Sequence, residues 1–241
     1  MPPHDSSPAE SRYSDGDYLS RHPGWHREHS AWKAAQIAAL LRRQNRTPRS
    51  IVEVGCGAGG ILAELQRALG AGEFTGYEIA PAALELAAPL ANGRLRFVLG
   101  DFLALDTPPS DLLLAIDVAE HVEDYLGFLR ALRPRARAHV FHLPLDLSLL
   151  SSCQPRRLDW NFESVGHLHY FTAETALRAL ANAGYTVRAH TFTAVELDLP
   201  PPDAQQQRLR FLRRLGRRLS PAWTSRLLGG FSLLAYCEAA P

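Results

Sequence analysis

The chain has 241 residues, 46% of them hydrophobic, which is enough for one domain with a complete core and too short for two separate ones. Its formal net charge of +1 gives no reason to expect nucleic acid or a strongly anionic membrane as a partner. Three widely spaced cysteines form neither a disulfide framework nor a zinc-binding spacing, and no apolar run reaches the ~18 residues of a membrane span. We therefore expect a cytoplasmic protein without integral membrane association.

The beginning of the chain predicts a tail and then a helical lid. Residues 1–20 are rich in Pro, Ser and Asp and offer too little apolar surface to offset the entropy of ordering, so a flexible tail is expected, and neither a secretory signal nor a membrane segment. Ser30 is predicted to cap a helix within residues 21–49. We interpret this aromatic segment as a lid that places Trp25 and His26 against a substrate. The alternative is that Trp25 and Trp32 only fasten the helix to the core.

Short apolar runs then alternate with helical stretches, which predicts a parallel sheet with crossover helices. The predicted strands are 50–54, 73–77, 94–99, 111–116, 138–142, 186–192 and 231–237, and the predicted helices are 60–69, 81–90, 124–132 and 172–183. We expect an α/β, Rossmann-like, doubly wound fold: a seven-stranded, mostly parallel sheet with helices on both faces and an N-terminal helical lid. Residues 21–241 would form a single domain around a core at 50–192.

Two stretches interrupt this rhythm, 144–169 and 198–230. The second contains three consecutive prolines and then seven arginines without an acid between residues 208 and 226. We interpret 198–230 as a basic helical insertion before the last strand, with its arginines on a solvated face. Contact of these arginines with an anionic substrate or lipid is the alternative.

A glycine-rich loop follows the first predicted strand, in the string Glu53-Val54-Gly55-Cys56-Gly57-Ala58-Gly59. Such a loop lets the backbone approach a ligand closely. Gly55, Gly57 and Gly60 also fit the spacing of dinucleotide-binding proteins, so the loop alone does not identify the ligand. Acidic residues at the carboxyl ends of four successive strands make the pattern more specific: Glu53, Glu78, Asp101 and Asp117.

With these residues the sequence resembles the class I S-adenosylmethionine-dependent methyltransferases, in the branch that acts on small molecules. The strings at 53–59, 117–124 and 166–172 carry the resemblance. It implies S-adenosylmethionine as cofactor, with Gly55, Cys56, Gly57 and Gly59 under the methionine and ribose and Glu53 supporting that loop. It further implies that Glu78 binds the ribose hydroxyls, Ile79 covers the adenine, and Asp101 and Phe102 hold its amino edge. Asp117 and Val118 would line the methionine end, with Glu120 and His121 beside the site of transfer.

The implied function is methyl transfer to an oxygen or nitrogen atom of a small molecule, in a monomer or a homodimer. An accessory protein that binds the cofactor without transferring a methyl group is the alternative. A nicotinamide-dependent enzyme is disfavoured because no second catalytic domain is available. A nucleic-acid methyltransferase is disfavoured because residues 117–121 lack the Asn/Asp-Pro-Pro-aromatic string that holds a flipped base.

Histidines near predicted strand ends are the candidates for a base, because the unperturbed pKa of histidine lies near neutrality. We expect His142 and His169 to lie in the pocket, with Asp146 as a partner, and His121 beside them. Asp146, His167 and Tyr170 are expected to contact the substrate. His167 and His169 also have a metal-like spacing, but no run of Asp and Asn at the strand ends supports an oxygen-rich metal site, so no metal is expected.

Overall fold

Seven strands form one mixed sheet in the order β3-β2-β1-β4-β5-β7-β6, in the computed structural model of the chain. The structure describes residues 24, 25, 27–199 and 204–240, so the predicted tail at 1–20, residue His26 and the proline triplet lie outside it. The strands are β1 (Ser50–Val54), β2 (Glu73–Glu78), β3 (Leu95–Leu99), β4 (Ser110–Ile116), β5 (Ala136–Pro144), β6 (Tyr185–Thr193) and β7 (Ser232–Ala239). Strand β7 runs antiparallel to both of its neighbours, and the other described pairs are parallel.

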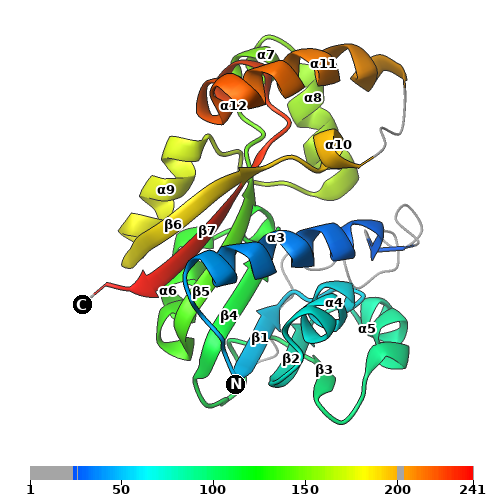
Figure 1. The fold of residues 1–241 in the computed structure, drawn as a ribbon, viewed down its shortest axis with the longest axis vertical. Helices are drawn as coiled ribbons and strands as arrows, with labels where there is room; N and C mark the ends of the chain where they lie inside the picture. The colour runs from blue at the N-terminus through cyan, green and yellow to red at the C-terminus, as the bar shows by residue number, and fades with distance from the viewer. Residues whose placement is uncertain (1–23, 26, 200–203, 241) are drawn as a thin grey trace.

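Helices cover both faces of this sheet (Figure 1). They are α3 (Ser30–Arg43), α4 (Gly60–Leu69), α5 (Pro81–Ala87), α6 (Tyr125–Leu132) and α9 (Ala173–Asn182). The predicted fold class is confirmed, and each predicted strand lies within two residues of its predicted bounds. The predicted helix at 81–90 is interrupted, because its last three residues form a 3-10 turn.

The predicted cap at Ser30 is wrong. Helix α3 begins at Ser30 itself, and the preceding residue, His29, makes no side-chain capping bond. Ser30 is buried and its side chain occupies the space where a side chain on Gly60 would lie. The serine therefore packs α3 against the start of α4 instead of accepting from the helix backbone.

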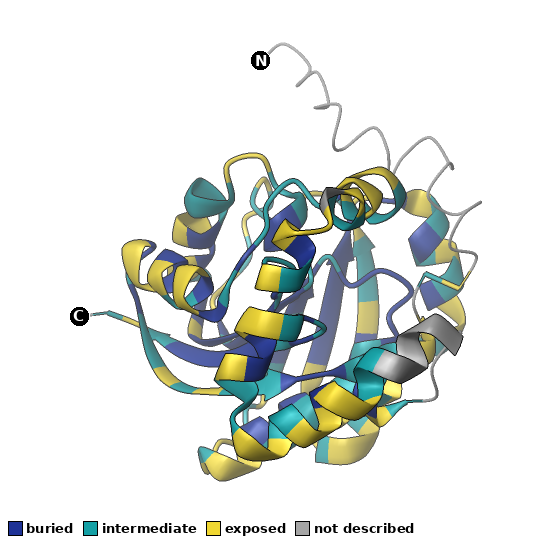
Figure 2. Cartoon of the chain, turned by 90° about the horizontal axis from the view of Figure 1, so that it is seen from above, coloured by how far each residue is buried: buried dark blue, intermediate teal, exposed yellow. Residues whose placement is uncertain are grey.

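Two hydrophobic cores lie on the two faces of the sheet. Residues such as Ile37, Leu41 and Leu62 join α3 and α4 to one face, and Leu129 and Leu180 join α6 and α9 to the other. In Figure 2 the buried residues of the helices, in dark blue, lie on the side toward the strands, and the exposed residues, in yellow, lie on the outer side. Burial of these apolar stripes stabilises the sheet and holds its strand ends at fixed positions.

A cap of helices lies beyond one end of the sheet (Figure 1). It consists of α7 (Leu149–Ser152), α8 (Pro155–Trp160), α10 (Val195–Asp198), α11 (Ala204–Leu219) and α12 (Pro221–Leu228). None of the helices that the structure describes is long and apolar enough to cross a membrane.

The arginines of the basic insertion are largely used inside this cap. Arg213 is 2% exposed and donates to Glu196 at 2.8 Å and to the carbonyl of Leu228 at 2.8 Å. Further contacts join Arg210 and Arg214 to backbone carbonyls, Arg217 to Asp198 and Arg226 to Glu174. These contacts give the basic segment a structural use, in which it clamps α10 and α12 to the rest of the cap.

Candidate functional site

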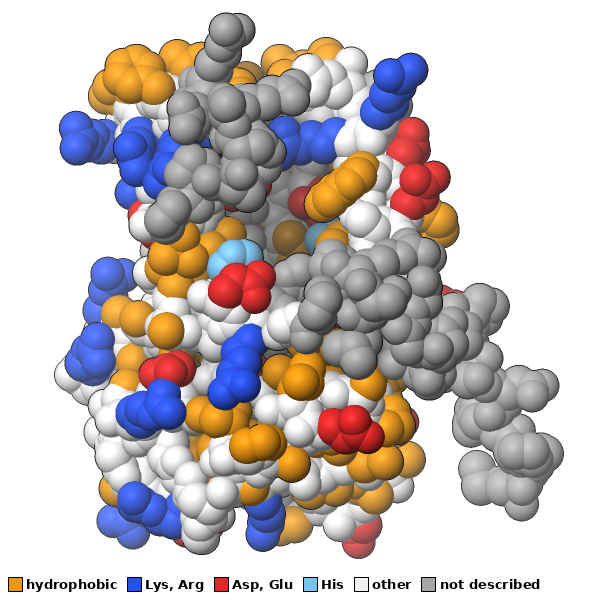
Figure 3. Space-filling model, turned by 90° about the vertical axis from the view of Figure 1, so that its right-hand side faces the viewer, with side chains coloured by type: hydrophobic (Ala, Val, Ile, Leu, Met, Phe, Trp, Pro, Cys, Tyr) orange, Lys and Arg blue, Asp and Glu red, His pale blue; other side chains and the backbone are white. Residues whose placement is uncertain are grey.

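A cavity of about 390 Å³ lies where β1, β4 and β5 end, between helix α3 and the cap. In Figure 3 histidine, acidic and apolar side chains meet around a recess on this side of the molecule. The carboxyl ends of parallel strands at the point where strand order reverses are the usual ligand site in such sheets, and β1 and β4 are neighbours at that point.

The glycine-rich loop forms one wall of the cavity. Gly55, Gly57 and Gly59 all have positive φ angles, which explains glycine at these three positions. Backbone N–H groups of Gly55 and Cys56 donate to the carbonyl of Tyr77 at 2.9 and 3.1 Å, so the loop is tied to β2. The Cys56 side chain is buried beneath the loop.

Glu53 lies under this loop as a buried carboxyl group. Its side chain is 1% exposed, and its Oε2 atom has no hydrogen-bond partner among the described residues. Burial raises the pKa of Glu53 to about 8; the positive charge of Lys33 opposes this shift, and Glu78 and Asp117 add to it. A cationic ligand in the cavity would favour the ionised form of this group.

Glu78 supports the loop from the end of β2. Its Oε2 atom accepts from the Gly57 N–H at 2.8 Å, and its Oε1 atom accepts from the backbone of Ile79 and Ala80, each at 2.9 Å. Burial raises the pKa of Glu78, and these three hydrogen bonds oppose the shift. Glu78 lies next to the cavity lining, where its carboxylate holds Gly57 in position.

Asp117 carries the densest electrostatic contacts of the site. One carboxylate oxygen lies 2.5 Å from Nδ1 of His142, and the other accepts from Nζ of Lys33 at 2.5 Å. Burial alone would raise the pKa of Asp117, but the charges and hydrogen bonds of His142 and Lys33 together hold it well below its usual range. Asp117 also has a φ of +54°, a conformation that is uncommon outside glycine and frequent at functional sites.

His142 lies at the cavity with both ring nitrogens engaged. Nδ1 faces Asp117, and Nε2 lies 2.8 Å from the hydroxyl oxygen of Thr193 on β6. A histidine held in this way orients Asp117. The expected role of His142 as a base stays a prediction.

A second group of polar side chains lies on the cap side of the cavity. Glu120 and His121 belong to the 3-10 turn η3 (Ala119–His121), and His167 follows the π-helical turn η5 (Asn161–Val165). Nδ1 of His167 lies 2.6 Å from Asp146, so Asp146 pairs with His167, not with His142 or His169 as expected. All four residues line the cavity.

The segment after η5 is fastened to η3 by its backbone. The carbonyl of Glu120 accepts from the N–H groups of Leu168 at 2.8 Å and His169 at 3.1 Å. The Nε2 atom of His169 is within hydrogen-bond distance of the carbonyls of Val122 and Glu123. The His169 side chain therefore lies outside the cavity lining and helps to hold this segment against the residues that follow η3.

Tyr170 and Phe102 also lie elsewhere than expected. The Tyr170 hydroxyl donates to the carbonyl of Leu158 at 2.9 Å, outside the cavity lining. The Phe102 ring is 2% exposed and packs edge-on against Tyr77, beneath the guanidinium of Arg135. The ring of Phe102 belongs to the core and offers no face to an adenine.

The remaining predicted residues lie around the glycine loop. The side chain of Val118 packs on Gly55, at a distance that leaves no room for a Cβ there. Ile79 is 43% exposed, and Asp101 is exposed, with one oxygen accepting from the backbone N–H of Leu103. These side chains are available to a ligand that extends from the loop over the end of β2.

Trp25 lies directly on the loop. A Cβ atom on Gly57 would lie 2.6 Å from Cδ1 of the Trp25 ring, and Trp25 and Trp32 both line the cavity. The other lid candidate, His26, lies outside the described residues. The described part of the segment before α3 thus contributes to the lining of the cavity beside the glycine loop.

Lys33 and Thr193 are among the residues of the site that the sequence reasoning does not identify. Lys33 directly precedes Ala34 and lies one turn before Ile37 on α3, so a charged residue beside the apolar stripe is the signal that could identify it. Thr193 is the last residue of β6, and only the position of β6 next to β7 brings it toward His142.

Comparisons with known proteins agree with this geometry. Residues 25–190, more than half of the chain, match the model of a family described as a methyltransferase domain. No protein among those with curated descriptions matches the sequence.

Solved structures are similar to the fold over nearly its whole length. A chain of the complex between the Haloferax volcanii Trm112 methyltransferase activator and a methyltransferase has a TM-score of 0.67 and 19% identity, covering 97% of this chain and 98% of that one. Magnesium protoporphyrin IX methyltransferase from Synechocystis PCC 6803, with bound S-adenosylhomocysteine, has a TM-score of 0.65 and 14% identity, with coverages of 96% and 100%. The N-methyltransferase NodS from Bradyrhizobium japonicum has a TM-score of 0.55 and 16% identity, with coverages of 86% and 87%. At these identities the likeness shows the fold alone.

Proposed function

The chain belongs to the methyltransferase domain family, and from this premise we propose that it transfers a methyl group from S-adenosylmethionine to an oxygen or nitrogen atom of a small biosynthetic molecule. The observation that carries the proposal is the acidic lining of the cavity beside the glycine loop. Its lining contains five carboxyl groups, and Lys33 is its only lysine or arginine among the described residues. The five are Glu53, Asp117, Glu120, Asp146 and Glu196.

This charge pattern complements the methyl donor. S-adenosylmethionine carries two positive groups, the sulfonium and the amine, and one carboxylate. Carboxyl groups that surround a cationic ligand stabilise it more strongly in a partly buried site than in water. Lys33 is the group of the lining suited to the donor's carboxylate, and Glu53 and Asp117 lie on the side suited to its amine.

The glycine loop supports the same orientation. The backbone of Gly55 and Gly57 would pass under the methionine and ribose, with Glu78 at the ribose hydroxyls and exposed Ile79 against the adenine. Since Trp25 lies on Gly57, it would have to move aside or cover the bound donor. We therefore propose that the segment before α3 acts as a lid that excludes water from the reaction.

The chemistry needs positioning more than side-chain reactivity, because the sulfonium already activates its methyl group. A lone pair on the acceptor oxygen or nitrogen attacks the methyl carbon, the carbon–sulfur bond breaks, and its electron pair stays on sulfur to give S-adenosylhomocysteine. A hydroxyl acceptor also loses its proton to a base or to water. The acceptor would enter from the side of Glu120, His121 and His167, opposite the loop.

The test is calorimetric titration of the protein with S-adenosylmethionine and S-adenosylhomocysteine, followed by transfer of a radiolabelled methyl group to a panel of phenols, catechols and amines. Glu78→Gln should weaken donor binding at least tenfold, since hydrogen bonds to charged groups contribute about 1.5–3 kcal/mol. Glu73→Gln, at the exposed start of the same strand, is the matched control and should bind normally.

Each outcome separates the candidate functions. Donor binding with methyl transfer to a small molecule supports the proposal. Donor binding with no transfer to any acceptor favours an accessory protein that only holds the cofactor. Absence of donor binding to the folded protein contradicts both.

A further inference from the structure

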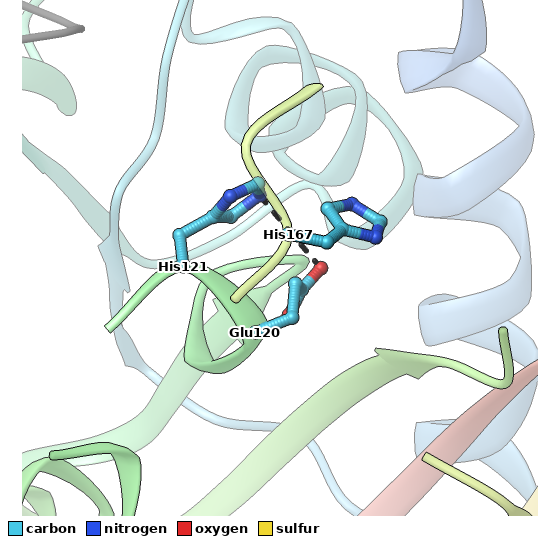
Figure 4. Close-up of side chains that lie close together, drawn as sticks. All are labelled: Glu120, His121 and His167. Carbon is cyan, nitrogen blue, oxygen red and sulfur yellow. Dashed lines mark ion pairs between the residues drawn. The ribbon is translucent and has the colours of Figure 1, made fainter. Parts of the chain in front are cut away.

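Three side chains on the cap side of the cavity converge on one point. Glu120 and His121 extend from η3, and His167 approaches from the segment after η5 (Figure 4). One ligand atom from each lies within 4.8 Å of the other two. The spacing of His167 and His169 in the sequence suggests a different pair, but His169 is turned to backbone carbonyls and takes no part.

Both histidines are oriented from behind by oxygen atoms. Nδ1 of His167 lies 2.6 Å from a carboxylate oxygen of Asp146, and Nδ1 of His121 lies 3.1 Å from the carbonyl of Gly166. The tautomer that donates from Nδ1 places the lone pair on Nε2. Histidines that bind metals show this arrangement, in which a carboxylate or carbonyl fixes the ring and the opposite nitrogen faces the ion.

Glu120 is the acidic member of the group. Its side chain is 0% exposed, and neither carboxylate oxygen has a hydrogen-bond partner among the residues that the structure describes. Oε1 faces Nε2 of His121 at 3.9 Å. A buried carboxyl group stays ionised only when a positive partner lies beside it, and a bound metal ion is such a partner.

We propose that Glu120, His121 and His167 bind one divalent transition-metal ion of the Zn²⁺ or Fe²⁺ type, with Asp146 as the positioning residue for His167. Two imidazoles and one carboxylate suit these ions and leave coordination positions open. Metal–ligand bonds of about 2.1 Å place the ligand atoms of a tetrahedral site about 3.4 Å apart. Small side-chain rotations that move these atoms by about 1 Å would therefore complete the site.

The open positions would face the cavity that these residues line. An ion there would hold an oxygen of the acceptor, or a water molecule, opposite the glycine loop. This role rests on the proposed methyl transfer, whereas binding of the ion does not. The two can therefore be tested separately.

The experiment uses the full chain, freed of metal by dialysis against a chelator and titrated with Co²⁺ as a spectroscopic probe. We expect one Co²⁺ per chain, with visible absorption that Zn²⁺ abolishes by displacement. His167→Ala should weaken binding at least 100-fold, and Asp146→Asn 10- to 100-fold through loss of ring orientation. His190→Ala removes an exposed histidine of β6 and is the matched control, with unchanged affinity expected.

No saturable Co²⁺ binding, or equal affinity in the parent and both Asp146→Asn and His167→Ala, would overturn the proposal. Circular dichroism verifies folding of each variant, and Asp146→Asn decides the test if His167→Ala does not fold. Donor titration of the metal-free protein is measured in parallel. Co²⁺ binding without donor binding would contradict the proposed function alone, and donor binding without Co²⁺ binding would contradict the metal site alone.

Discussion

Nδ1 of His142 lies 2.5 Å from Oδ1 of Asp117, so the end of β5 holds the side chain that follows β4. The contact explains how Asp117 keeps its left-handed backbone with the carboxylate directed at Lys33. It also makes Asp117 the centre of the charge network.

Replacement of Asp117 tests this network. Asp117→Asn keeps the size and tolerates the left-handed conformation, but it leaves Lys33 without its closest anion. We expect a loss of about 3 kcal/mol in the free energy of unfolding near pH 7. Because the folded-state pKa of Asp117 is lowered, its contribution is present above the unfolded pKa and is lost as pH falls through the folded value. Urea unfolding of parent and variant should thus differ most above about pH 4 and converge in acid; a difference independent of pH contradicts the assignment.

Glu53 should give the opposite pH dependence. Its folded-state pKa of about 8 lies above the unfolded value of 4.5, so the folded protein binds the proton more tightly between these pH values. The parent therefore loses stability as pH rises through this window, by at most about 1.4 kcal/mol per pH unit from this group. Glu53→Gln has no titrating group at this position. Its free energy of unfolding relative to the parent, measured in urea, should therefore rise from pH 5 to pH 8. A constant difference across that range would show that Glu53 titrates normally.

A side chain at Gly57 should disturb both the loop and its cover. The alanine Cβ would lie 2.6 Å from the Trp25 ring, at a φ of +52° that costs roughly 1–2 kcal/mol outside glycine. We expect Gly57→Ala to lower the free energy of unfolding by at least this amount and to weaken donor binding, measured by thermal melting and calorimetry. Gly93→Ala, where no atom lies within 4 Å, is the control and should leave both unchanged. Adding Trp25→Ala should remove the loss of stability that comes from the steric clash and leave the loss that comes from the backbone conformation. Complete recovery of stability in the double variant would show that the clash with Trp25 causes the whole loss.

His169 should have a structural role, in which it holds the segment after η5 in place, and should not act as a base. His169→Ala removes the hydrogen bonds to Val122 and Glu123, which contribute about 1 kcal/mol. We expect faster hydrogen exchange at the amide of Leu168, which is bonded to Glu120, and an unchanged pH profile of turnover. A shifted pH profile with unaltered exchange would restore His169 as a base, and a loss of turnover of about 10²-fold or more would then be expected.

The sequence predicts the sheet well because each strand carries its own signal. Apolar runs such as the one at Ile51 are buried from both sides, and the glycines of the loop mark a turn that other residues adopt with difficulty. The ends of adjacent parallel strands meet in space, so Glu53 and Asp117 come near each other as the pattern implies. These features depend on local sequence and on one rule of sheet geometry.

The partners within the site follow from long-range packing instead. Asp146 faces His167 because the segment after η5 returns to η3. The spacing of residues in the sequence does not predict this contact. Phe102 follows a strand end, yet its ring turns into the core to meet Tyr77. A side chain near a strand end can point to either side, and only packing decides which.

The cavity has walls of two different origins. The wall next to the glycine loop consists of strand ends that the hydrophobic cores hold in place, as at Glu53 and Asp117. The opposite wall includes Trp160, Asn161 and Val195, which belong to the capping segments outside the sheet. Evolution can therefore exchange the cap, and with it the shape offered to an incoming molecule, while the sheet and the loop stay as they are. The same boundary marks where a grafted segment from a relative would alter selectivity with the least cost to folding.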